Sequence, residues 1–400
     1  MTIYASLGVR TVVNARGNAT LAGGTLMDPA VVDAMAEASR AFVRIGDLQE
    51  AAGAQIAALT GAEGGYVTTG AAAALTLGAA AMLARLDPDA MDRLPDTGDM
   101  PSEIVVQRTH RNPYDHLVRA SGARLIEFGG AQGGTADEMA AAIGPATAGA
   151  FYHGQAEGLG LSIEAFASAA HAHALPVLVD ASMSLPPRDN LRRFVAAGAD
   201  LVAFSGGKTI GGPQASGFLA GRRELLLSVG LQQQDMDVLP ATWALRSLLD
   251  TGALRRPPLH GIGRSMKTGK EEIVGLLVAL RRYAERDEAS DRRRWDALTG
   301  AMAAELARIP GLIAHAEPTQ SDGRPVPMTV VRVDPVGYGR TAVELVRALE
   351  TLDPIVMLAD HEAPRGILRL DPENLDEASA ALVVEAFRRC ARPPLRAVAR

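Results

Sequence analysis

The sequence has few of the features of secreted, membrane or nucleic-acid-binding proteins. Its 400 residues include one cysteine, Cys390, which excludes an intrachain disulfide and fits a reducing cytoplasm. Aromatic residues make up 4% of the chain and leave few platforms for stacking bases, and the net charge of −6 argues against a broad nucleic-acid footprint. No signal peptide and no apolar run able to span a bilayer is recognisable. We therefore expect a cytoplasmic protein without nucleic-acid or membrane partners.

Glycine and apolar residues are abundant, with 41 glycines and 48% hydrophobic residues. Short apolar runs alternate with helical patterns, which predicts an α/β protein with a mostly parallel sheet. The seven candidate strands are 65–68, 103–107, 124–128, 148–152, 177–180, 201–204 and 217–220. The polar, proline-rich stretch 86–101 is expected to be an exposed loop.

The chain divides by pattern into four parts. We expect an N-terminal arm and first helix at 1–45, a large domain at 46–260, a linking helix at 261–286 and a small α+β domain at 287–400. Candidate strands of the small domain are 328–333, 355–358 and 366–370. Asp28 followed by Pro29 is a typical start for the first helix.

Lys208 stands in a glycine-rich turn, Ser205-Gly206-Gly207-Lys208, directly after an apolar run. Lysine is rarely buried unless it is paired or used. One use is a Schiff base with the aldehyde of pyridoxal 5'-phosphate (PLP). We interpret Lys208 as that lysine, and an ordinary loop lysine is the alternative.

Asp180 ends the apolar run 176–179 and is the candidate partner of the PLP ring nitrogen. An ionised carboxylate there keeps this nitrogen protonated, so that the ring accepts carbanion charge. The alternative is a helix N-cap. Ser182 is a candidate cofactor contact or part of a tight turn, and His153 either reaches the cofactor oxygen or belongs to a turn.

A phosphate-binding helix start is predicted after the strand at 66–68. Its residues are Thr69, Gly70, Ala71 and Ala72. Free N–H groups in the first turn of a helix bind anions, and small side chains allow close approach. Ser205 is placed to add a phosphate contact. Each feature alone has an ordinary explanation, but all of them follow predicted strands, and ligands of open α/β sheets bind at that edge.

Three segments resemble the bacterial selenocysteine synthase (seryl-tRNA selenium transferase) superfamily. They lie at 8–27, 179–217 and 261–272. The resemblance implies an aspartate-aminotransferase-like fold type I, in which a mostly parallel seven-stranded large domain precedes a smaller C-terminal domain. It is strongest to the branch of D-glucosaminate-6-phosphate ammonia-lyase-like proteins. It also implies a homodimer or larger homo-oligomer, with Gln214 in a loop that closes the site with the partner subunit.

The remaining site candidates are less specific. His110 follows the strand at 103–107 and is the candidate ring that stacks on PLP, with His116 as the alternative. Arg108 is a candidate for an anionic substrate group. The family resemblance points to Arg369 for the substrate carboxylate, with Arg365 competing. No metal site is predicted, since no set of ligands has suitable spacing.

The expected reaction is an α,β-elimination in which a β-hydroxyl or similar group leaves a hydroxy or sugar-derived amino acid, giving an enamine that becomes a 2-keto acid and ammonia. Lys208, Asp180 and His110 are the catalytic candidates. A racemase, an epimerase or an aldolase would use the same machinery. A tRNA-dependent selenium transferase is disfavoured by the acidic composition.

Overall fold

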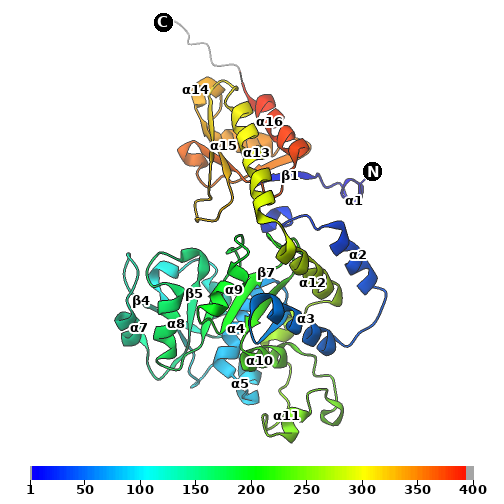
Figure 1. Ribbon diagram of the computed structural model, residues 1–400, viewed down its shortest axis with the longest axis vertical. Helices are drawn as coiled ribbons and strands as arrows, with labels where there is room; N and C mark the ends of the chain where they lie inside the picture. Colours follow the sequence, from blue (N-terminus) through cyan, green and yellow to red (C-terminus); the bar gives the residue numbers. More distant parts are fainter. Residues whose placement is uncertain (1, 393–400) are drawn as a thin grey trace, which may run out of the picture. The chain divides into compact units, whose positions relative to one another are not determined.

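The computed structural model describes residues 2–392, so the last eight residues of the expected small domain lie outside it. The chain forms two compact units (Figure 1). The larger is Met27–Glu285, and the smaller combines Met1–Leu26 with Arg286–Arg400. The expected linking helix consists of a 3-10 turn, η5 (Ile262–Met266), and α12 (Lys270–Glu285), and both belong to the larger unit.

One seven-stranded sheet organises the larger unit, in the order β2-β8-β7-β6-β5-β3-β4. Its strands are β2 (Gly64–Thr68), β3 (Glu103–Gln107), β4 (Arg124–Phe128), β5 (Thr147–His153), β6 (Val177–Asp180), β7 (Leu201–Ser205) and β8 (Gly217–Gly221). Strand β8 runs antiparallel to its neighbours β2 and β7, and the other pairs are parallel. The mostly parallel seven-stranded sheet predicted from the sequence is therefore confirmed.

Strands β6, β7 and β8 are buried on both faces, which explains their apolar runs. Val177 and Val179 of β6 enter one hydrophobic cluster, and Leu178 between them enters another. The first cluster includes residues of α3 (Ile45–Thr60), α7 (Ala136–Ala142), α8 (Ile163–His171), α9 (Asn190–Ala196) and α12. The second includes residues of α4 (Gly70–Ala84), α5 (Pro88–Arg93), α6 (Asp115–Arg119) and α10 (Arg223–Gln233). Two helical layers thus enclose the sheet.

Helix α4 is central to the second layer. It contacts β5, β6, β7 and β8, and every residue from Ala73 to Ala84 is buried. A helix enclosed in this way is apolar on all sides, as its alanine- and leucine-rich sequence indicates. A short helix, α1 (Ile3–Ser6), precedes the helix predicted at Asp28-Pro29, which is α2 (Pro29–Ala38) and packs on α12. Its predicted cap is confirmed, because the Asp28 side chain accepts a hydrogen bond from the backbone N–H of Ala30.

The stretch 86–101 is not simply an exposed loop. Helix α5 lies within it and buries Ala90 and Met91. The Asp87 side chain caps this helix by accepting from the N–H of Asp89, and Pro88 occupies the first turn. The expectation was wrong here because aspartate and proline, which we took as loop signals, also begin helices.

The smaller unit contains a three-stranded antiparallel sheet, in the order β12-β10-β9, and a parallel pair, β1-β11. Its strands are β1 (Val12–Ala15), β9 (Leu312–Glu317), β10 (Met328–Val333), β11 (Ile355–Leu358) and β12 (Ile367–Leu370). Its main helices are α13 (Glu288–Leu306), α15 (Ala342–Leu349) and α16 (Glu377–Cys390). The three predicted strands are present, and β1 and β9 were missed. No helix within residues 2–392 is long and apolar enough to cross a membrane.

Candidate active site

Most of the predicted site residues in the larger unit meet at one edge of its sheet. Strands β2, β3, β5, β6 and β7 point the same way, so their carboxyl ends share that edge. Strand β8 begins there, since Gly217 is paired with both Ser205 and Thr68. This is the edge at which open α/β sheets bind ligands.

Asp180 is the last residue of β6 and is 4% exposed. Its Oδ1 accepts a hydrogen bond of 2.9 Å from the backbone N–H of Ser182. Its Oδ2 lies 4.0 Å from Nε2 of His153, which is its register partner in β5. A buried carboxylate with acceptor capacity at the sheet edge suits a protonated ring nitrogen. Ser182 thus contacts Asp180 through its backbone N–H.

Lys208 is half-buried in a tightly folded loop after β7. A side chain at Gly206 would collide with the Ser216 hydroxyl, and one at Gly207 would collide with the backbone of Gln214. The N–H of Gly206 donates to the Ser216 carbonyl at 2.8 Å. The two glycines before the lysine are therefore required by close approach of the returning chain. Gln214 itself is exposed, at the surface of this loop.

The predicted phosphate cradle is the first turn of α4. Gly70 begins the helix at φ +78°, and a Cβ added there would meet no atom within 4 Å. A Cβ at Gly217 would lie 2.5 Å from the Gly70 carbonyl carbon and 2.6 Å from the Ala71 nitrogen. The helix start therefore rests directly on the first residue of β8. The side of Gly70 on which a Cβ would point is open.

The Thr69 side chain is hydrogen-bonded to residues 266–268, which lie far away in sequence. Its hydroxyl donates to the carbonyl oxygen of Met266 at 2.7 Å, with the Lys267 carbonyl oxygen at 3.0 Å and the Thr268 hydroxyl at 3.2 Å. Thr69 thus positions residues 266–268 beside the cradle.

His110 lies at the site edge, in the turn after β3, and is 1% exposed. Its ring packs edge-on against Tyr152 at 4.4 Å between centroids. Burial, followed by the charge of His153, lowers the pKa of His110 to about 4. His116, the alternative, is an exposed residue of α6. Burial makes His110 neutral at physiological pH but also leaves almost none of its surface free to stack on a ligand, so its stacking role stays a prediction.

The arginines predicted to bind substrate already hold carboxylates. Arg108 pairs with Glu127 at 3.0 Å. In the smaller unit, Arg369 pairs with Glu317 and with Glu362, each at 2.6 Å. Arg365 pairs with Glu362 at 3.1 Å. A substrate carboxylate would have to compete with these partners.

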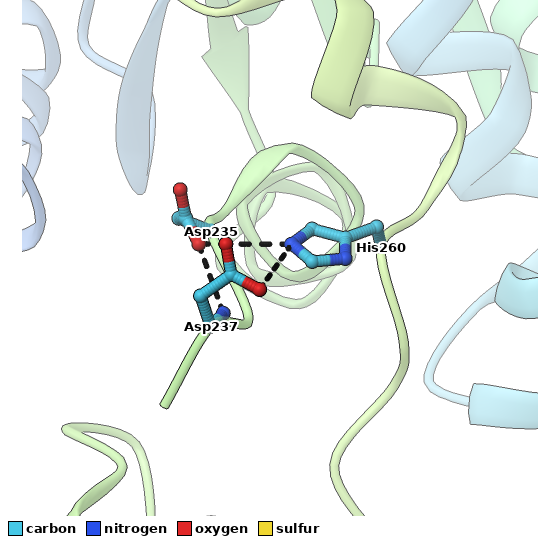
Figure 2. Close-up of side chains that lie close together, drawn as sticks. All are labelled: Asp235, Asp237 and His260. Carbon is cyan, nitrogen blue, oxygen red and sulfur yellow. Dashed lines mark hydrogen bonds and ion pairs between the residues drawn. The ribbon is translucent and has the colours of Figure 1, made fainter. Parts of the chain in front are cut away.

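A potential cation-binding group, which the sequence did not suggest, lies in an exposed turn (Figure 2). Nε2 of His260 is 3.6 Å from Asp235 Oδ1 and 3.9 Å from Asp237 Oδ1. Asp235 already accepts from the N–H of Asp237 at 2.9 Å and pairs with Arg264 at 2.9 Å. These donors, the Asp237 N–H first, lower the pKa of Asp235. The contacts explain the cluster as a hydrogen-bonded turn, and we assign it no metal.

The comparisons with known proteins agree with one another. Residues 43–237 match the family model of L-seryl-tRNA selenium transferase. The chain is 34% identical to a 5'-C-glycyluridine monooxygenase-decarboxylase of Streptomyces sp, over 95% of this chain and 90% of the relative. It is 31% identical to the D-glucosaminate-6-phosphate ammonia lyase of Salmonella typhimurium, over 97% of this chain and 98% of the relative.

Solved structures agree with the sequence relatives. A structure of D-glucosaminate-6-phosphate ammonia-lyase superposes with a TM-score of 0.80 and 29% identity, covering 98% of each chain. A serine palmitoyltransferase structure with PLP, at 16% identity and a TM-score of 0.56, covers 95% of this chain and 87% of that one and shares the fold. The chain therefore belongs to the L-seryl-tRNA selenium transferase superfamily of fold-type-I PLP enzymes, in the branch that includes D-glucosaminate-6-phosphate ammonia-lyase.

Proposed function

We propose that this protein is a PLP-dependent lyase that removes ammonia from a hydroxy or sugar-derived amino acid and releases a 2-keto acid. The observation that carries the proposal is the meeting of Lys208, Asp180 and the first turn of α4 at one sheet edge. The relative whose name states this reaction matches over nearly the whole chain.

The residues at this edge fit PLP. The open side of Gly70 and the N–H groups of the α4 first turn suit a phosphate. The buried Asp180 suits the ring nitrogen, and Lys208 supplies the amine for a Schiff base. When bound, the cofactor supplies an electron sink for charge that develops at the substrate Cα.

Each side chain has one role in this proposal. The Lys208 amine would hold the cofactor and would also be the base that takes the proton from the substrate Cα. Asp180 keeps the ring nitrogen protonated. His110, which is neutral at physiological pH, stays the candidate for the ring beside the cofactor. Arg108, Arg369 and Gln214 stay candidates for substrate contacts.

The same proton removal also starts racemisation, epimerisation and aldol cleavage. The Streptomyces relative, at 34% identity, bears the name of a monooxygenase-decarboxylase. Two relatives that are about equally identical in sequence to this chain therefore bear the names of different reactions. An oxidative decarboxylation is the second candidate, and it differs from a lyase by consuming O2 and releasing CO2.

We also propose a homodimer or larger homo-oligomer in the cytoplasm. Large apolar side chains are exposed near the start of the larger unit. Val32 is 46% exposed, Phe42 103%, Val43 51% and Ile45 45%. Such a run of exposed apolar residues suits an interface between copies of the chain.

The first experiment tests the cofactor and its lysine. The sequence has only three lysines, Lys208, Lys267 and Lys270, so reduction with borohydride followed by peptide mass mapping locates an attached cofactor without ambiguity. We expect the pyridoxyl group on Lys208, with Lys267 and Lys270 as internal controls. A Lys208→Ala protein should yield no labelled peptide. Protein that binds no added PLP, or that carries it on another lysine, contradicts the proposal.

The second experiment tests the reaction. D-glucosaminate 6-phosphate, its unphosphorylated form, serine and glycine derivatives are incubated with the PLP-loaded protein in deuterated water. Ammonia and a 2-keto acid in equal amounts indicate the lyase. Deuterium at Cα with inversion and no keto acid indicates a racemase or epimerase. Loss of O2 with release of CO2 indicates the oxidative alternative.

A further inference from the structure

Gln107 is a completely buried amide at the end of β3. Its Oε1 accepts hydrogen bonds from two backbone N–H groups, that of Leu161 at 2.8 Å and that of Gly134 at 3.1 Å. Its Nε2 lies 2.9 Å from Nε2 of His110. One side chain thus joins two loops to the turn that carries His110.

The two backbone donors determine the orientation of this amide. A flipped amide would place its NH2 group against two N–H groups that cannot accept a hydrogen bond. A side chain at Gly160 would also collide with the Gln107 amide, so the loop packs closely around it. The NH2 group of Gln107 therefore faces His110.

An NH2 group can only donate, so this contact is a hydrogen bond only if His110 Nε2 is unprotonated and accepts. The other ring nitrogen, Nδ1, lies 3.2 Å from the backbone nitrogen of His153, which is a second donor. An imidazolium has N–H groups at both nitrogens and would face a donor on each side. A neutral ring can accept at only one nitrogen. With Nε2 unprotonated it keeps the shorter contact, from Gln107, and its Nδ1 proton then faces the His153 N–H.

We propose that Gln107 is a positioning residue that holds His110 as a neutral imidazole with Nε2 unprotonated. The lowered pKa of His110 agrees with this arrangement, and its causes are burial and the neighbouring His153. Tyr152, the other titratable group against the ring, presents its aromatic edge. Neither neighbour supplies the acceptor that a second ring proton would need.

The inference deepens the proposed function, because His110 borders the cofactor in that proposal. A charged His110 beside a protonated pyridine ring would place two cations together and would compete for Asp180. A neutral His110 would bring an aromatic ring without charge to the cofactor. The measurement of its protonation needs no cofactor, so the inference and the lyase proposal can fail separately.

The first test is made on the unaltered protein. Histidine labelled with nitrogen-15 gives ring-nitrogen shifts that separate protonated from unprotonated positions, and a His110→Asn protein identifies the signal among the eight histidines. We expect Nε2 of His110 to be unprotonated at pH 7, and the ring to stay neutral down to about pH 5. A protonated Nε2 at pH 7 overturns the proposal without any variant of Gln107.

The second test reverses the polarity of the contact. In Gln107→Glu, one carboxylate oxygen can still accept from Gly134 and Leu161, while the other becomes an acceptor for His110. We expect the proton to move to Nε2 and the pKa of His110 to rise by roughly one to three pH units, as for an opposite charge at this range.

Gln55→Glu is the matched control, because it adds the same charge on α3, where Oε1 of Gln55 already accepts from Arg281 at 3.2 Å. Its His110 signal should match that of the unaltered protein. An unchanged His110 in a folded Gln107→Glu protein refutes the positioning role. An equal change in both variants would refute it too, since a general charge effect would then suffice.

Discussion

Thr69 and Met266 are joined by a hydrogen bond of 2.7 Å from the threonine hydroxyl to the methionine carbonyl oxygen. The same carbonyl accepts from Nε2 of Gln233 at 2.7 Å. A hydroxyl has one hydrogen, so in this arrangement the Thr69 side chain does not donate to a phosphate. In the proposed site, Thr69 would therefore act by connecting the start of α4 with residues 266–268, and the phosphate would be left to backbone N–H groups.

Replacing this hydroxyl should weaken PLP binding. One hydrogen bond contributes about 1 kcal/mol net, so Thr69→Val should raise the dissociation constant of PLP about fivefold. Thr69→Ser keeps the hydroxyl and should bind as the unaltered protein does. Absorbance titration with PLP measures both. Thr351→Val removes an exposed hydroxyl bonded to Ala348 in the smaller unit and is the control. Equal affinities of the valine and serine variants at position 69 would show that the connection is unimportant.

Gly217 should tolerate no side chain. A Cβ there would approach backbone atoms of Gly70, Ala71 and Phe204, which cannot move aside as a flexible side chain would. Gly217→Ala should lower the free energy of unfolding by roughly 1–3 kcal/mol. Gly144→Ala, with no atom within 4 Å of its Cβ, should change it by less than about 0.5 kcal/mol. Urea unfolding measures both, and similar effects of the two substitutions would contradict the packing argument.

Asp180→Asn tests the ring-nitrogen partner. Removing an opposite charge at this range should lower the pKa of the ring nitrogen by roughly one to three units. Because each unit is a factor of ten in protonation, exchange of the substrate α-proton should slow roughly tenfold to thousandfold. Deuterium incorporation followed by NMR measures the rate.

The control is Asp200→Asn. Asp200 is equally buried, at 5% exposed, but it precedes β7 at the opposite edge and pairs with Arg222 at 3.2 Å. It should alter stability and leave α-proton exchange unchanged. A comparable loss of exchange in both variants would mean that folding, and not the ring nitrogen, is the cause.

Asp371 should make stability depend on pH. It is 3% exposed, and burial, followed by the charge of Glu373, raises its pKa from 3.8 to about 7. Between these values the folded protein holds one proton more than the unfolded chain. The contribution of Asp371 is therefore complete below about pH 4 and is lost as the pH rises through 7, by up to about 1.4 kcal/mol per pH unit.

Asp371→Asn removes this titration and should flatten the change in free energy of unfolding between pH 5 and pH 8. Denaturant unfolding at several pH values measures the difference between variant and unaltered protein. Asp376→Asn serves as the control, because that carboxylate caps α16 and its pKa is lowered, chiefly by the Ser379 side chain. A parallel pH dependence of the Asp371 variant and the unaltered protein would contradict the prediction.

The large sheet was predictable because most of its strands are buried apolar runs that end in glycine, polar or charged residues, as in β6 and β7. All seven strands were found, including the less buried β2 and β4. Strand β9 was missed because its burial is irregular, and Ile313 is 63% exposed. Strand β1 was missed because it is four residues long and its first, Val12, is exposed. The partner of β1 is β11, far along the chain, so local pattern carries little signal for that strand.

The candidate site likewise contains some residues that could be predicted from the sequence and others that could not. Lys208, Asp180 and the start of α4 were recognisable because each follows a strand and has a distinctive local sequence. Gln107 carried no such signal, since its role depends on Gly134, Leu161 and His110. The ion pairs of Arg369 with Glu317 and Glu362 could not be predicted from the sequence either.

The sequence by itself determined the fold class, the family and the order in which the chemical groups follow the strands, because periodicity, glycine turns and helix caps act over a few residues. Only the tertiary structure decided which of these groups touch. It buried His110 against Gln107, bound the Thr69 hydroxyl to Met266 and gave Arg369 two carboxylate partners. Hydrogen bonds and desolvation depend on atoms brought together from distant positions, and that geometry exists only in the folded chain.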